Sequence, residues 1–144
     1  MRTACIMLAL LALTGWARAQ ESGASAGDTV EALKTAYDEG TEAEQVAAIE
    51  AAVSVVDPAV VRGVAAGARS KSLAVRYAAI DALGRMDSKD ALRELHSLYR
   101  NDPSLKKDTD LMAAVLKAIG RHGDKSSIDI LADSPINNLT YETG

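Results

Sequence analysis

The sequence has few of the residues on which many functional sites depend. It holds one cysteine, Cys5, one tryptophan, Trp16, and no phenylalanine in 144 residues. Both single residues lie within the first nineteen positions. If that segment is cleaved off, no thiol remains for a disulfide, for nucleophilic catalysis or for a thiolate metal site. The stability of the remaining chain must then come from the packing of its secondary structure.

The first nineteen residues have the pattern of a cleaved export signal. A basic start at Arg2 is followed by the apolar run 6–13, and Ala17 and Ala19 stand at positions −3 and −1 of a cut after residue 19. The run is too short to cross a bilayer, which takes about 20 apolar residues. We therefore predict export to the periplasm or the extracellular space, with no stable membrane insertion after cleavage. The alanine-rich signal is typical of bacteria.

Charge in the remaining chain argues against a nucleic-acid partner. Without residues 1–19 there are fourteen basic and twenty acidic side chains, a net charge of −6. Nonspecific binding to nucleic acid requires a basic surface. The charge is also uneven, because residues 21–60 carry nine acidic side chains and one lysine. The rest of the chain is mildly basic.

Helical periodicity runs through the chain, and strand patterns are missing. We predict a flexible lead-in at 20–27, a helical repeat domain at 28–133, and a tail at 134–144 that contains the possible start of a further repeat. Signals for helix starts and stops divide the domain into predicted helices over 30–37, 43–55, 58 onward, 73–86, 89–99, 111–119 and 126–132. No long stretch alternates β-branched with polar residues, so the fold class is all-α.

Specific residues set the predicted helix ends. Asp28 or Thr29 is expected to cap the first helix, and Gly40 to end it. Asp57 caps the third, with proline at its first position. Gly120 is expected to close the helix over 111–119.

The chain repeats itself with a spacing of 31 and then 36 residues. The extra five residues fall in the predicted loop 101–108, where an insertion costs least. A helix pair with one apolar stripe on each helix must stack on its neighbours to bury that stripe. The spacing therefore predicts an α-solenoid of antiparallel helix hairpins. Matching positions include Val30, Val61, Leu92 and Ile128; Ala51, Ala82 and Ala118; Gly84 and Gly120; and Arg85 and Arg121.

One segment of this array resembles a known family. Residues 75–84 read VRYAAIDALG, similar to the V-R-x-x-A-x-x-A-L-G core of HEAT repeats, and 111–120 repeat it with Met112 in place of the arginine. The unit is closest to the short bacterial HEAT-like form, also found in phycobilisome lyases. The resemblance extends over about 28–133 and implies a HEAT-like superhelix. It implies little about function, because fold alone does not determine function.

Four arginines and a histidine form the candidate partner-binding set. Arg62 and Arg93 are 31 residues apart, as are Arg69 and Arg100, and within each helix the two arginines are separated by two turns. Stacked repeats would place all four in a grid, with His96 nearby. Second helices line the concave side of HEAT-like solenoids, and arginines suit carboxylates and phosphates. The alternative is that these arginines are solvated, pair with nearby acids or complement helix C-termini.

No catalytic, metal or cofactor site is predicted. His96 and His122 are the only histidines and lack metal-ligand spacing. His122 is expected to be exposed in a turn. Asp108 and Asp110 have the spacing of a cation pair, but a helix cap is the commoner role.

These observations favour an exported, non-catalytic scaffold that binds a protein partner on its concave face. An acidic partner would fit the arginines. The alternatives are a lyase-like enzyme, an accessory subunit of an exported enzyme complex, or a structural spacer within a larger exported protein.

Overall fold

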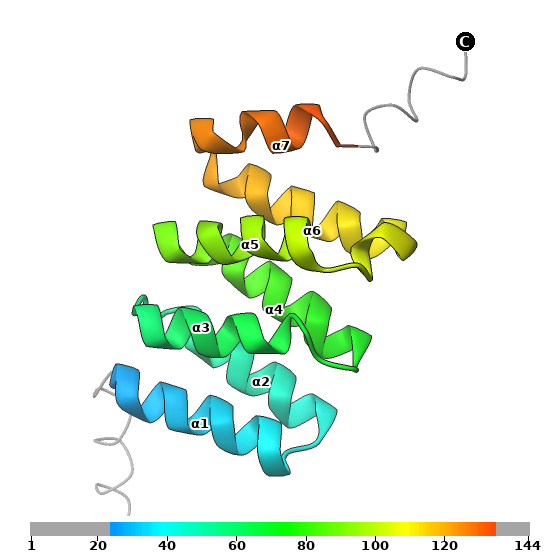
Figure 1. Ribbon diagram of the computed structural model, residues 1–144. Coiled ribbons are helices and arrows are strands. Elements are labelled where there is room, and N and C mark those ends of the chain that lie inside the picture. The colour runs from blue at the N-terminus through cyan, green and yellow to red at the C-terminus, as the bar shows by residue number, and fades with distance from the viewer. Residues whose placement is uncertain (1–23, 135–144) are drawn as a thin grey trace, which may run out of the picture.

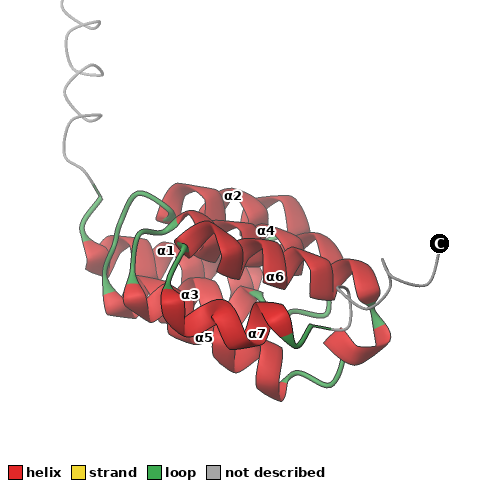
Figure 2. Ribbon diagram, turned by 90° about the horizontal axis from the view of Figure 1, so that it is seen from above, coloured by secondary structure: helices red, strands yellow, loops and turns green. Residues whose placement is uncertain are grey.

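The computed structural model describes residues 24–134, and the predicted signal, the first part of the lead-in and the tail from 135 onward lie outside them. All regular structure in the described part is helical. The helices stack in two layers, with α2, α4 and α6 in one and α1, α3, α5 and α7 in the other (Figures 1 and 2). The predicted α-solenoid is confirmed. The α-helices are α1 (Ala26–Glu39), α2 (Glu42–Ala52), α3 (Pro58–Gly67), α4 (Leu73–Arg85), α5 (Lys89–Asn101), α6 (Thr109–His122) and α7 (Ile128–Ala132), with 3-10 turns η1 (Leu105–Lys107) and η2 (Lys125–Ser127).

Most helix starts follow from local side-chain chemistry. Asp57 caps α3 by accepting from the amide of Ala59 at 2.7 Å, and Asp108 caps α6 in the same way through Leu111 at 3.0 Å. Each cap satisfies one of the amides that a helix leaves free in its first turn. The predicted capping role of both aspartates is confirmed. The cap of α1 differs from the prediction, because Ser25 takes that place and the helix begins three to four residues earlier than expected.

The end of α6 corrects a second prediction. Gly120 does not close the helix, which continues to His122 and ends at Gly123. Gly123 has φ 61°, the left-handed conformation that glycine adopts without steric cost and that commonly terminates helices. Gly120 lies in the last helical turn instead.

The 31- and 36-residue register corresponds to repeated contacts between neighbouring helices. Arg85 on α4 reaches back to Glu50 on α2 at 2.6 Å, and its counterpart Arg121 on α6 reaches back to Asp81 on α4 at 2.5 Å. The same ion pair therefore occurs at two successive junctions of this layer. Because these side chains are 38–46% exposed, we attribute little stability to them.

The core is formed by the inner stripes of both layers. It is made of aliphatic and alanine side chains, among them Ile49, Val64, Ile80, Leu95 and Ile119, all at most 1% exposed. The predicted insertion at 101–108 is tied to this core by Leu105 of η1, which is also buried. The loop is therefore anchored to the core despite its extra length.

Candidate functional site

The surface between α3 and α5 contains two adjoining pockets. The first has a volume of about 350 Å³ and brings together Arg62 of α3 and Arg93 of α5. Ser97 lines this pocket and also the second one, of about 340 Å³, so the two adjoin at its side chain. We call their combined lining the α3–α5 groove: Pro58, Val61, Arg62, Arg69, Arg76, Asp90, Arg93, Glu94, Ser97, Leu98, Asn101, Asp102, Pro103 and Ser104.

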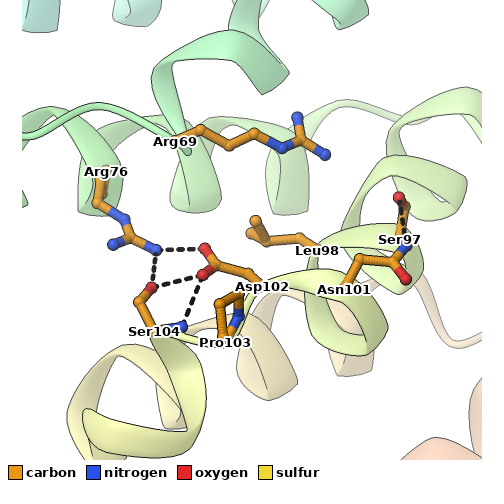
Figure 3. Close-up of a pocket in the computed structure, with 8 residues that line it drawn as sticks. All are labelled: Arg69, Arg76, Ser97, Leu98, Asn101, Asp102, Pro103 and Ser104. Atoms are coloured by element: carbon orange, nitrogen blue, oxygen red, sulfur yellow. Dashed lines mark hydrogen bonds and ion pairs between the residues drawn. The ribbon is translucent and has the colours of Figure 1, made fainter.

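Three of the predicted arginines line this groove, and their side chains make few hydrogen bonds or ion pairs. Arg62 is exposed and has no hydrogen-bond or ion-pair partner among residues 24–134. Arg93 is 77% exposed and pairs only with Asp90, one turn away on its own helix. Arg69 lies over the second pocket (Figure 3), half exposed, with Glu94 at 3.9 Å and the carbonyl of Ala65 at 3.3 Å. Exposed ion pairs of this kind contribute little, so these guanidinium groups are available to a ligand.

The other two predicted residues lie away from the groove. Arg100 is exposed near the end of α5 and lines neither pocket. His96 turns toward the next repeat, where its Nε2 lies 3.0 Å from Ser127 Oγ. Desolvation, together with the nearby charge of Arg100, holds the pKa of His96 below its usual value. The structure therefore brings three arginines together and does not form the predicted grid of four with a neighbouring histidine.

Arg76 is a residue of the groove that the sequence prediction missed. Its guanidinium donates to Asp102 at 2.6 Å and to Ser104 Oγ at 2.7 Å (Figure 3). It also donates to the carbonyl of Ala68 at 3.0 Å. Arg76 and Asp102 are 12% and 16% exposed. Arg76 thus connects the start of α4 to the ends of α3 and α5. Because its guanidinium group is held by these contacts, it lines the base of the groove and is not available to a ligand.

Asp102 is held in its charged form by this network. Burial opposes the charge, but two hydrogen bonds from Ser104 and the proximity of Arg76 outweigh it and lower the pKa of Asp102. The signal that pointed to Arg76 was its place as the arginine of the V-R motif at 75–76. Its partners lie up to 28 residues away, so local spacing could not identify them.

His122 departs from the expectation of an exposed turn residue. It is the last residue of α6, partly buried, and its Nε2 donates to the carbonyl of Leu83 on α4 at 3.0 Å. Across residues 24–134 no three side chains of histidine, cysteine or acidic type gather in a way that would hold a metal ion. In the same part of the chain no helix has the length and apolar character needed to cross a membrane.

Comparison with known families identifies the repeat. A family model described as HEAT repeats matches residues 29–106, which is more than half of the chain. No curated protein and no solved structure matches it. The matched region contains most of α1, all of α2 to α5 and hence the α3–α5 groove.

Proposed function

Because the chain belongs to the HEAT-repeat family, we propose that it is an exported scaffold that binds an acidic segment of a partner protein along the α3–α5 groove. HEAT repeats generally mediate protein–protein interaction, and scaffolds built from them are typically non-catalytic. The groove is formed by second helices of consecutive repeats, which we place on the concave side of the solenoid.

The observation that carries this proposal is the unpaired state of Arg62 beside Arg93. Two guanidinium groups from successive repeats line one pocket, and only one of them has an acidic partner among residues 24–134. A carboxylate can accept two parallel hydrogen bonds from a guanidinium, which makes arginine well suited to acidic ligands. A carboxylate entering this pocket would pair with Arg62 without first breaking an existing contact.

The distance between the arginines along the groove indicates the backbone conformation of the acidic segment. Arg62 lies on α3 and Arg69 lies in the turn two residues after its end at Gly67, so the helical rise of 1.5 Å per residue gives their separation along the groove only as roughly 10 Å. In an extended peptide, residues three apart are separated by about the same distance. We therefore expect the segment to lie extended along the groove, with carboxylates at every third residue.

A double charge reversal tests the groove. We expect Arg62→Glu combined with Arg93→Glu to weaken binding of a labelled Glu-Gly-Ser-Glu-Gly-Ser-Glu peptide at least tenfold, because attraction becomes repulsion at two contacts. Fluorescence anisotropy at low salt measures the affinity. Arg100→Glu is the matched control, since Arg100 lines neither pocket, and a peptide with glutamine at each acidic position controls for charge. Equal weakening by Arg100→Glu, or equal binding of the glutamine peptide, would contradict this site.

The proposed export depends on residues 1–19, and it can be tested separately from the groove. The basic start, the short apolar run and the small residues before position 20 support cleavage and transfer out of the cytoplasm. We expect the chain, expressed in a bacterium from its full sequence, to be recovered from the periplasm or medium with Gln20 as its first residue. N-terminal sequencing of the recovered protein checks this, and an uncleaved cytoplasmic product would contradict it.

A further inference from the structure

The α3–α5 groove contains three carboxylates beside its arginines, and two of them already have a close cation. Asp102 accepts a hydrogen bond from Arg76 at 2.6 Å (Figure 3), and both side chains are at most 16% exposed. Asp90 pairs with Arg93, one turn along the same helix. A ligand cation would have to compete with these arginines, so it gains little by approaching either acid. The third carboxylate belongs to Glu94 on α5.

Glu94 has only a loose contact with the rest of the protein. Its one ion-pair partner in the described part of the chain is Arg69 at 3.9 Å, which is beyond the length of a hydrogen bond. The Glu94 side chain is 30% exposed. Because a carboxylate can accept about four hydrogen bonds, Glu94 keeps most of its capacity for a donor from outside the chain.

The position of Glu94 places its charge between the arginines that would hold an acidic segment. Glu94 lines the first pocket together with Arg62 and Arg93. Its partner Arg69 lines the second pocket. The two pockets adjoin at Ser97, which is one turn from Glu94 on the same face of α5. A segment that extends from Arg62 to Arg69 must therefore pass this carboxylate.

The repeat itself does not require an acid at this position. The 31-residue spacing matches Glu94 with Gly63 on α3, and the 36-residue spacing matches it with Ile130 on α7. Neither counterpart is charged. Glu94 also takes no part in capping α5, because the cap of that helix is Ser88. The charge of Glu94 is therefore a property of this groove and not of the HEAT repeat.

We propose that Glu94 selects partner segments in which a lysine or arginine stands between two acidic residues. This inference rests on the proposed binding of an acidic segment along the α3–α5 groove. One carboxylate of the segment would pair with Arg62 and Arg93. The cation would then meet Glu94 and leave Arg69 to a second carboxylate. A purely acidic segment would instead be repelled by Glu94, since like charges across an interface are unfavourable.

Peptides that differ only between their glutamates test this selection. The acidic peptide Glu-Gly-Ser-Glu-Gly-Ser-Glu is compared with Glu-Lys-Ser-Glu-Lys-Ser-Glu and Glu-Gly-Lys-Glu-Gly-Lys-Glu, because the cation can occupy either intervening place. The lysine peptides carry less negative charge, so net charge alone predicts that they bind more weakly to a groove lined by arginines. We expect one of them to bind about threefold more tightly than the acidic peptide, measured by fluorescence anisotropy at low salt.

The variant Glu94→Gln keeps the size of the side chain and removes its charge. We expect it to lose the preference for lysine and to bind the acidic peptide about threefold more tightly than the original chain, because the repulsion is removed. Asp110→Asn is the matched control, since it removes one exposed acidic charge on α6, outside the groove. This control should keep the preference of the original chain. Thermal unfolding midpoints should be similar for all three proteins.

The results separate this selection from the proposed function. If the acidic peptide binds through Arg62 and Arg93 but neither lysine peptide binds more tightly, selection by Glu94 is wrong and the groove remains a site for acidic segments. A preference for lysine that persists in Glu94→Gln would also overturn the selection. If none of the peptides binds, or if the double charge reversal leaves binding unchanged, the proposed function fails and the selection with it.

Discussion

Replacing Arg76 with methionine is expected to lower the free energy of unfolding by about 3 kcal/mol, because it leaves the Asp102 carboxylate without its cation in a mostly buried site. Arg76 and Asp102 are only 12% and 16% exposed. The substitution also removes the donors to the carbonyl of Ala68 and to Ser104. Urea denaturation followed by circular dichroism measures the loss. A loss below about 1 kcal/mol would show that water replaces the guanidinium at little cost.

The loss of stability in Arg76→Met should depend on pH in a defined direction. The pKa of Asp102 is lowered in the folded chain, so its charged form stabilises the fold above the ordinary aspartate pKa of about 3.9. That contribution is lost as the pH falls through the folded-state pKa of Asp102. The difference in free energy of unfolding between the original chain and Arg76→Met should therefore become smaller in acid. Adding Asp102→Asn to Arg76→Met should recover part of the loss, since no unpaired charge remains.

The fold could be predicted because its signals are local and repeated. Capping residues such as Asp57 and Asp108 lie within three residues of the amides that they bind, and the apolar stripes recur with a fixed spacing. The end of α6 was mispredicted for a related reason. Two glycines three residues apart can each end a helix, and only the backbone shows that Gly123, not Gly120, adopts positive φ.

The candidate site could be predicted only in part, because equal sequence spacing did not give equal environments. Arg62 and Arg93 lie within α3 and α5 at matching places, and they share a pocket. Arg69 and Arg100 are also 31 residues apart, but α3 ends at Gly67 while α5 continues to Asn101. Arg69 therefore lies in a turn beside the second pocket, whereas Arg100 remains on its helix, outside both pockets.

The tight contact between α4 and α6 at Gly84 gives a prediction of similar size to that for Arg76. We expect Gly84→Leu to lower the free energy of unfolding by about 3 kcal/mol, at the upper end of the cost of overpacking a core. Even a Cβ at Gly84 would lie 2.9 Å from the Cα of Ala118, so α4 and α6 must separate to admit a leucine. That separation would disturb the contacts of Ile80 and Ile119, both at most 1% exposed in the core.

Gly120→Leu is the matched control for this prediction, because it makes the same change at the equivalent position of the next repeat. Nothing lies within 4 Å of a Cβ at Gly120, and leucine has the better helix propensity by roughly 0.8 kcal/mol. We expect this variant to be slightly more stable than the original chain. Urea denaturation of both variants compares them directly. Equal effects at the two glycines would mean that the contact between α4 and α6 does not limit the size of the side chain at position 84.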